Sequence, residues 1–191
     1  MALVSYGVQF MKKDSASLAY IGQKPGTQVP DSDAWFTPGE FIERVRRCMG
    51  SIDLDPISCA EANVTIRARV FFSKEDSAIG RPWCTHGKLT VFINPPYGRG
   101  TLRPALRAFL DAWFDGQISQ AVVLVNNATE TQWFQSLAQE CSALCLAAKR
   151  IAFYNTDGKE CSGNTRGQVF LYFGHDKKRF KAEFSLVGVV L

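Results

Sequence analysis

The sequence predicts an α/β fold in which an open, mostly parallel β-sheet is flanked by helices and ends in an antiparallel C-terminal ribbon. Two observations predict this fold. Four short runs rich in Val, Ile, Leu and Phe occur, and three of them are separated or followed by helical patterns, as is typical of strands that helices cover on both faces. Residues 150–191 instead hold apolar runs joined by turns. The four runs are residues 51–55, 69–72, 89–93 and 121–125.

Composition limits the class of protein. The chain has 191 residues, 46% of them hydrophobic and 21% charged, which suits one compact domain. It has no apolar run long enough to span a bilayer, and residues 1–15 lack the continuous apolar segment of a secretory signal. We therefore expect a soluble protein of the cytoplasm, with no membrane partner and with its six cysteines as free thiols.

The net charge and the supply of metal-ligating residues bear on two further classes of partner, polyanions and metal ions. The net charge of +4 permits a polyanionic partner without requiring one. The chain has no CxxC pair and only two histidines, so we predict no metal site.

The first element of the folded domain is a helix. Residues 1–32 show no steady hydrophobic period, and we interpret them as an N-terminal extension. Thr37 then matches a helix N-cap, Pro38 the first helical position and Glu40 the third, and apolar residues at helical spacing continue to Met49.

The remaining helices and strands are predicted from the spacing of apolar residues along the chain. Apolar stripes predict helices over residues 102–114 and 131–141. Residues 151–154, 168–173 and 184–191 resemble strands, and we expect them to form the antiparallel ribbon.

Polar residues follow each of the first four predicted strands. In an open α/β sheet the ligand site lies beyond the carboxyl ends of the strands, so these residues are the first candidates for a site. If the strands are parallel, all four groups share one edge of the sheet. The groups are Asp53-Leu54-Asp55-Pro56, Lys74-Glu75-Asp76, Asn94-Pro95-Pro96-Tyr97 and Asn126-Asn127.

The most specific of these groups is Asn94-Pro95-Pro96-Tyr97. It should occur by chance in roughly one chain in a thousand of this length. Two prolines can simply end a strand, but that interpretation does not account for the tyrosine.

A functional interpretation gives each position of this motif a role. An exocyclic amine such as adenine N6 is a poor nucleophile, so a site must accept hydrogen bonds from it as its nitrogen becomes tetrahedral. The Asn94 side-chain oxygen and the Pro95 carbonyl can accept them, held in place by the stiffness of Pro95 and Pro96. The Tyr97 ring can stack on a flipped base, a contact worth about 1–3 kcal/mol.

The motif resembles the amino-methyltransferase motif of S-adenosylmethionine-dependent enzymes. Its surroundings resemble the short phage-type DNA N6-adenine methyltransferases, the Dam-like family. The resemblance covers roughly residues 33–173, and the matching segments, in chain order, are Trp35-Phe36-Thr37-Pro38, Asp53-Leu54-Asp55-Pro56, residues 60–63, Phe71-Phe72 before Asp76, Trp83, residues 91–98, residues 122–127, Thr131-Gln132-Trp133-Phe134 and Arg150-Ile151-Ala152-Phe153.

The resemblance implies a Rossmann-like methyltransferase fold over a catalytic domain of residues 33–191. We expect a trimmed sheet, because the region between the first strand and the motif is short. The usual glycine-rich turn after the first strand is absent, and Asp55-Pro56 stands there instead.

The resemblance also implies site residues, with S-adenosyl-L-methionine as cofactor. The segment Trp35-Phe36-Thr37-Pro38 would close over the methionine end of the cofactor, whereas Thr37 also matches the helix N-cap, and the two roles can coexist. Asp55 would meet the cofactor's amino group and Asp76 its adenine amine, although Asp53 and Asp76 also suit solvated surface charges. The implied catalytic residues are Asn94, Pro95, Pro96 and Tyr97, and the implied cofactor-binding residues are Trp35, Thr37, Pro38, Asp55, Pro56, Asp76 and Asn94.

Double-stranded DNA is the implied partner. Arg99, Arg103 and Arg107 recur every four residues, which suits phosphate contact; alternatively they form a solvated helix face paired with Asp111. Trp133 fits either a DNA contact or the apolar stripe of its helix. The candidate nucleic-acid-binding residues are Tyr97, Arg99, Arg103, Trp133, Asn164 and Arg166.

The sequence and the resemblance together predict a phage-type DNA adenine N6-methyltransferase that acts on a flipped adenine, as a monomer, in the cytoplasm of a bacterial host. Two alternatives stay open. One keeps the cofactor but methylates cytosine N4, RNA adenine or a protein glutamine, and the other is a non-catalytic DNA-binding module on the same scaffold.

Overall fold

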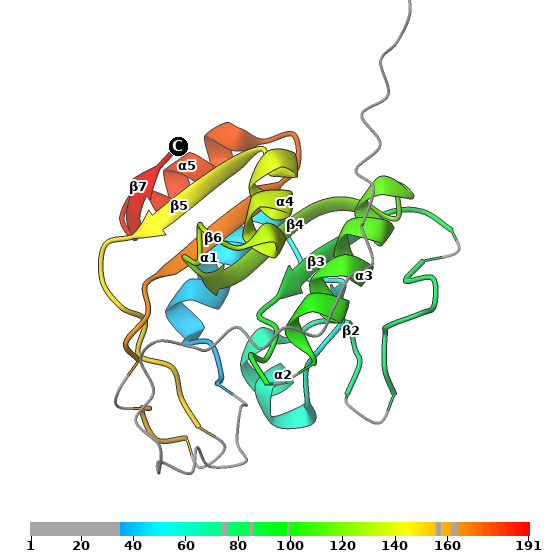
Figure 1. The fold of residues 1–191 in the computed structure, drawn as a ribbon, viewed down its shortest axis with the longest axis horizontal. Coiled ribbons are helices and arrows are strands. Elements are labelled where there is room, and N and C mark those ends of the chain that lie inside the picture. The colour runs from blue at the N-terminus through cyan, green and yellow to red at the C-terminus, as the bar shows by residue number, and fades with distance from the viewer. Residues whose placement is uncertain (1–34, 74–75, 85, 99, 156–157, 162–163) are drawn as a thin grey trace, which may run out of the picture. The chain divides into compact units, whose positions relative to one another are not determined.

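The computed structural model describes residues 35–191 except 74–75, 85, 99, 156–157 and 162–163. The predicted extension, residues 1–32, therefore lies outside the described residues. The described residues form helices on both sides of a seven-stranded sheet with strand order β2-β1-β3-β4-β6-β5-β7 (Figure 1). The elements are α1 (Gly39–Met49), β1 (Leu54–Asp55), α2 (Ala60–Ile66), β2 (Val70–Phe71), β3 (Leu89–Ile93), α3 (Leu102–Phe114), β4 (Ile118–Asn126), α4 (Gln132–Glu140), β5 (Ala143–Ala147), β6 (Gln168–Phe173), α5 (Lys177–Phe184) and β7 (Gly188–Val190).

The sheet divides into a parallel half and an antiparallel half. β1 pairs in parallel with β2 and β3, and β3 pairs in parallel with β4. β6 then runs antiparallel to both β4 and β5, and β5 runs antiparallel to β7. This arrangement confirms the predicted Rossmann-like α/β fold with an antiparallel C-terminal part.

Two hydrophobic cores hold helices against the sheet. α3 and α4 lie in front of the sheet in Figure 1, and α1 lies behind it. β4 contributes side chains to both cores, because successive side chains of a strand point to opposite faces of the sheet. Val122 and Leu124 pack with α1, α2 and α5, whereas Val123 and Val125 pack with α3 and α4. Both cores are buried, so each side of the sheet is covered.

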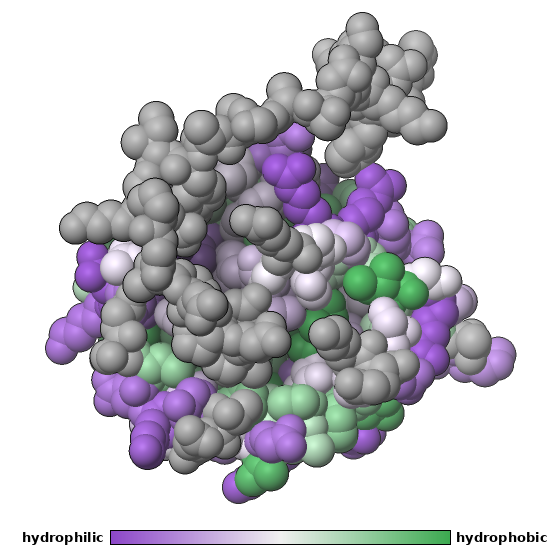
Figure 2. Space-filling view, turned by 60° about the horizontal axis from the view of Figure 1, so that its bottom comes forward, coloured by the Kyte–Doolittle hydropathy of each residue, from purple (hydrophilic) through white to green (hydrophobic). Residues whose placement is uncertain are grey.

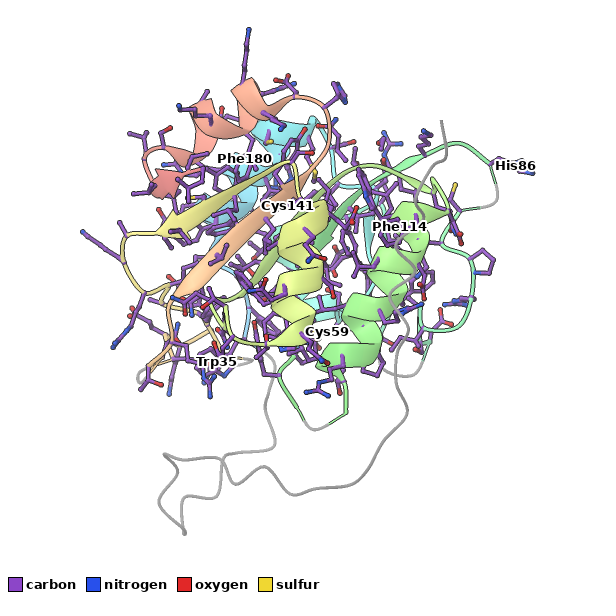
Figure 3. All side chains as sticks on the ribbon, turned by 45° about the horizontal axis from the view of Figure 1, so that its top comes forward. Trp35, Cys59, His86, Phe114, Cys141 and Phe180 are labelled. Atoms are coloured by element: carbon purple, nitrogen blue, oxygen red, sulfur yellow. The ribbon has the colours of Figure 1, made fainter. Side chains whose placement is uncertain are left out.

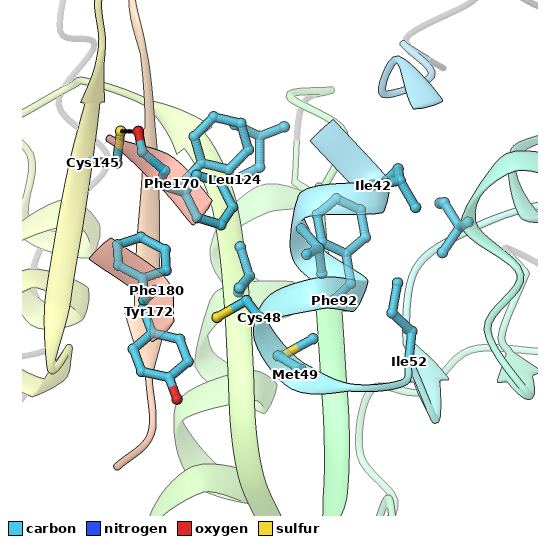
Figure 4. Close-up of a cluster of buried hydrophobic side chains, with 14 of the residues drawn as sticks. Ile42, Cys48, Met49, Ile52, Phe92, Leu124, Cys145, Phe170, Tyr172 and Phe180 are labelled. Carbon is cyan, nitrogen blue, oxygen red and sulfur yellow. Dashed lines mark hydrogen bonds between the residues drawn. The ribbon is translucent and has the colours of Figure 1, made fainter. Parts of the chain in front are cut away.

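Aromatic side chains of β6 and α5 pack together in the core behind the sheet (Figure 4). Phe180 and Phe184 of α5 lie one helical turn apart, with their ring centroids separated by 4.5 Å. Phe180 also stacks on Tyr172 of β6 at 5.0 Å. The Asp176 side chain caps α5 by accepting a hydrogen bond from the Arg179 N–H at 2.9 Å.

The C-terminal ribbon differs in detail from the prediction. A strand was expected over residues 184–191, but the chain forms α5 up to Phe184 and a strand only over Gly188–Val190. The Asp176 cap and the four-residue spacing of the phenylalanines favour the helix. The strand predicted over residues 151–154 is also wrong: within the described part of that loop, pairing is confined to isolated bridges at Tyr154.

Other elements were not predicted at all. The hydrophobic pattern of the sequence predicts neither α2 nor β5. α2 is only seven residues long, and its N-cap is Cys59, whose sulfur accepts a hydrogen bond from the Ala62 N–H at 3.5 Å.

The predicted start of α1 is wrong by one residue. Pro38 is the N-cap residue and α1 begins at Gly39, so Thr37 does not cap the helix. Its hydroxyl instead accepts a hydrogen bond from the Asn94 side chain.

All six cysteines lie among the described residues, and each is a free thiol, as predicted. Among the described residues, no helix is both long and apolar enough to cross a membrane.

The packing of α5 yields a stability prediction. Phe180→Ala should lower the free energy of unfolding by about 3–5 kcal/mol, because the stacked ring is fully buried and its loss leaves a cavity. Lys178→Ala, at an exposed position of the same helix, is the control and should change it by no more than about 0.5 kcal/mol. Urea unfolding followed by circular dichroism measures both, and equal effects would show that α5 is not docked as described.

Candidate active site

The carboxyl ends of the parallel strands meet at one edge of the sheet. Asp55 ends β1, Asn94 follows β3 and Asn126 ends β4. Figure 2 brings the lower side of Figure 1 forward and shows hydrophobic and hydrophilic residues mixed on the part of the surface that is coloured. The shared edge that the sequence predicted is confirmed for these three groups.

The side-chain amide of Asn94 has a defined orientation. Its nitrogen donates hydrogen bonds to the Trp35 carbonyl and to the Thr37 hydroxyl, both at 3.1 Å. A carbonyl can only accept, so the nitrogen must face Trp35 and the side-chain oxygen must face away. No donor from the described residues occupies that oxygen. The oxygen is therefore open to an incoming N–H group.

The segment that receives this amide is held by the rest of the domain. The backbone of Phe36 exchanges two hydrogen bonds with Tyr154, at 2.7 and 3.0 Å. The rings of Trp35 and Phe153 lie 5.6 Å apart. Thr37 is buried at 4% exposure. Residues 35–37 therefore form a fixed wall beside the Asn94 amide.

Tyr97 ends the motif at an exposed position. Its hydroxyl accepts a hydrogen bond from the Asn126 N–H, while 41% of the residue is exposed. Burial around the hydroxyl raises the pKa of Tyr97, against the lowering effects of the Asn126 N–H and of the Arg166 charge. The side chain thus stays a neutral phenol, anchored to β4 at its oxygen and open to solvent elsewhere. The preceding prolines are less exposed.

A buried glutamine, which the sequence analysis missed, joins three segments at this edge. The Gln168 amide nitrogen donates to the Asn126 side-chain oxygen at 3.3 Å and to the Arg166 carbonyl at 2.7 Å, and its oxygen accepts from the Ile151 N–H at 3.1 Å. Gln168 is only 3% exposed, so these bonds satisfy a polar group in the interior. The only sequence signal was a polar residue opening an otherwise apolar strand.

Asp53, which lies just before β1, and Asp55, which ends β1, have different environments. Asp53 is tied to β3, because its carboxylate accepts from the Thr90 N–H at 2.9 Å and from the Thr90 hydroxyl at 2.8 Å. Asp55 is buried at 2% exposure, and this burial raises its pKa to about 7, although the Ile57 N–H, which donates to its carboxylate at 3.3 Å, and the nearby Ser58 side chain act in the opposite direction. Pro56, which follows it, is buried as well.

Asp76 follows β2 in the chain and is paired with an arginine. Its exposed carboxylate pairs with Arg81 at 2.9 Å, and the Arg81 guanidinium lies 4.1 Å from the centre of the Phe72 ring. Asp76 is therefore an exposed side chain, as the alternative of a solvated surface charge expected, and its contact with a cofactor stays a prediction.

The candidate DNA contacts are spread over several elements. Arg103 is exposed in the first turn of α3, and Arg107 pairs with Asp111 at 2.8 Å, as the alternative interpretation expected. Trp133 is half-buried against the core of α3 and α4. The Asn164 amide donates to the Ile151 carbonyl at 3.0 Å and so helps to hold its own loop. Arg99 lies outside the described residues.

A hollow of about 350 Å³ adjoins the wall beside Asn94. Trp35 and Cys59 both lie toward the lower side of Figure 3, away from Phe180. The residues that line the hollow are Phe36, Thr37, Gly39, Glu61, Val64, Thr65, Tyr154, Asn155 and Gly158.

Among the described residues, no group of three or more His, Cys, Asp or Glu side chains is arranged to hold a metal ion.

Comparison with known proteins gives one match. A family model described as DNA N-6-adenine-methyltransferase (Dam) matches residues 24–190. No curated protein and no solved structure matches the chain. The matched range contains Asp55, Asn94 and Tyr97, and it also includes residues 24–32 of the predicted extension. Because the match covers most of its length, the chain belongs to the DNA N-6-adenine-methyltransferase (Dam) family.

Proposed function

We propose that this chain transfers a methyl group from S-adenosylmethionine to N6 of an adenine that is flipped out of a DNA duplex. Membership of the Dam family supports DNA adenine methylation. The observation that carries the mechanism is the orientation of the Asn94 amide, whose nitrogen is used within the protein and whose oxygen is not.

The open oxygen suits the chemistry of a conjugated amine. The N6 lone pair of adenine is delocalised into the ring, and it becomes nucleophilic only as the nitrogen becomes tetrahedral. The Asn94 oxygen and the Pro95 carbonyl would accept the two N–H groups during that change. Both belong to a stiff Pro-Pro corner, so the acceptors need little reorganisation as charge develops.

The Tyr97 ring would hold the flipped base. Its hydroxyl is bound to the Asn126 N–H, so the ring is tethered while its surface stays accessible. Stacking of one base on an aromatic ring is worth about 1–3 kcal/mol, comparable to the cost of unstacking that base.

The edge of the sheet also fits a cationic cofactor. S-adenosylmethionine, when bound, supplies an activated methyl group and a neutral leaving group. The buried Asp55 carboxyl offers a charge that a neighbouring cation would stabilise in its ionised form. Beside Asp55, the family resemblance suggests cofactor contacts at Trp35, Thr37, Pro38, Pro56 and Asp76, of which Asp76 would first have to exchange its partner Arg81.

Double-stranded DNA is the proposed partner. We propose that the protein acts on it as a monomer, as a phage-type enzyme, in the cytoplasm of a bacterial host. The positive charge of Arg166 acts to lower the pKa of the Tyr97 phenol, which supports Arg166 as a DNA contact near the motif. Arg103 suits a phosphate contact. Arg99, Trp133 and Asn164 stay predictions from the sequence.

Asn94→Ala should lower methyl transfer about 100- to 1,000-fold, the usual cost of removing one preorganised transition-state hydrogen bond. The measurement is transfer of labelled methyl groups to unmethylated DNA, followed by digestion and identification of the modified nucleoside. Gln139→Ala, an exposed amide on α4, is the control and should retain full activity.

Several outcomes would contradict the proposal. Wild-type protein that binds DNA but transfers no methyl group would favour a non-catalytic module. A product other than N6-methyladenine would identify another acceptor, and near-normal activity of Asn94→Ala would remove the mechanism.

Tyr97→Ala should lower base flipping and transfer by about 5- to 100-fold, because the stacking surface is lost. Tyr97→Phe keeps the ring and loses only the hydrogen bond to the Asn126 N–H, so it should stay within about fivefold of wild type. Fluorescence of a 2-aminopurine placed at the target position reports flipping. If both variants behave alike, the ring does not stack on the base.

Cofactor binding should release a proton near pH 6. With its pKa raised to about 7, most of the Asp55 carboxyl is protonated there in the free protein. A bound cation favours the carboxylate and lowers this pKa, so up to about one proton leaves; at pH 8 the carboxyl is already ionised and this release disappears. Calorimetry in two buffers of different ionisation enthalpy measures the release, and Asp55→Asn should abolish it. Equal release by that variant would assign the proton elsewhere.

A further inference from the structure

We propose that Thr37 is a positioning residue for Asn94. Its hydroxyl, together with the Trp35 carbonyl, fixes the Asn94 amide so that the oxygen faces the substrate amine. This inference rests on the proposed function for its catalytic consequence, but the hydrogen bonds themselves can be tested without activity.

The two acceptors have separate tasks. The amide nitrogen carries two hydrogens, and the structure gives one acceptor to each of them at 3.1 Å. The Trp35 carbonyl selects the orientation, because an amide turned over would set two acceptor oxygens against each other. The Thr37 hydroxyl takes the second hydrogen and stops the nitrogen from turning toward the substrate.

Thr37 is built to hold this position. It is 4% exposed, it lies between the backbone bridge of Phe36 to Tyr154 and the buried Pro38, and its branched side chain has few rotamers. It does not cap α1, so capping does not explain its hydroxyl. The bond to Asn94 joins residues that are 57 positions apart in the sequence.

Positioning can be separated from cofactor binding. The hydroxyl accepts from Asn94 through a lone pair and still has its own hydrogen to donate, so both roles are chemically compatible. Their kinetic consequences differ, because a lost cofactor contact raises KM for S-adenosylmethionine, whereas a misplaced acceptor lowers kcat.

Thr37→Val is the main test, since it replaces the hydroxyl by a methyl group of similar size. It should lower kcat about 3- to 12-fold, as expected for one net hydrogen bond, with KM for S-adenosylmethionine changed less than twofold. Thr37→Ser keeps the hydroxyl and should restore kcat to within about twofold of wild type. Ser185→Ala, which removes an exposed hydroxyl at the C-cap of α5, is the control and should leave both constants unchanged.

A second readout is independent of activity. In ¹⁵N-labelled protein, the two side-chain amide protons of Asn94 are identified by their absence in Asn94→Ala. In Thr37→Val one of them should shift upfield and exchange faster with water, because it has lost its acceptor. Thr37→Ser should resemble wild type, and Thr37→Ala serves as the second hydroxyl-free variant if the valine variant does not fold.

The outcomes are distinguishable. Unchanged Asn94 amide signals in the hydroxyl-free variants, or a rise in KM without a fall in kcat, would overturn the positioning role while the proposed function stands. A wild-type protein without methyl transfer, whose Asn94 signals still respond to Thr37→Val, would support the positioning role and overturn the proposed function.

Discussion

The parallel pairing of β1, β3 and β4 is the constraint on which the candidate site depends. Parallel strands end at the same edge, so three residues separated in sequence, Asp55, Asn94 and Asn126, reach one place. The same pairing requires helices on both faces, because crossover connections cover the sheet. Burial then gives the edge its chemistry: Asp55 ionises with difficulty, and the Asn94 amide is held by hydrogen bonds within the protein.

The sequence predicted most of the fold because periodicity is a local signal. Strands and helices with strong alternation or helical stripes, such as β3 and α3, lie where they were expected. α5 was missed because its interleaved lysines hid the spacing of Phe180 and Phe184, which becomes clear only once both rings meet the sheet. Short elements such as α2 carry too few residues to show a period at all.

The candidate site was predicted in part, and its limits have a physical cause. The role expected of Asn94 needs a side-chain oxygen that no donor of the protein occupies. The hydrogen bonds of the amide nitrogen to Trp35 and Thr37 leave that oxygen without a donor from the described residues. The predicted N-cap role of Thr37 is wrong because a capping pattern considers only neighbouring residues, whereas the partner of Thr37 comes from β3. Asp53 and Asp55 likewise look equivalent in sequence, and only the burial of Asp55 and the hydrogen bonds from Thr90 to Asp53 distinguish them.

The Gln168 amide has a consequence for how such a protein can diversify. One interior side chain joins the end of β4 to the segments at Ile151 and Arg166. An insertion or deletion that moved either segment would leave the buried Gln168 amide without a hydrogen-bond partner, which would lower the free energy of unfolding by about 1–3 kcal/mol. Under the proposed function, in which Asn164 and Arg166 contact DNA, a change of DNA target would arise more readily by exchanging exposed side chains between these anchor points than by reshaping the loops that carry them.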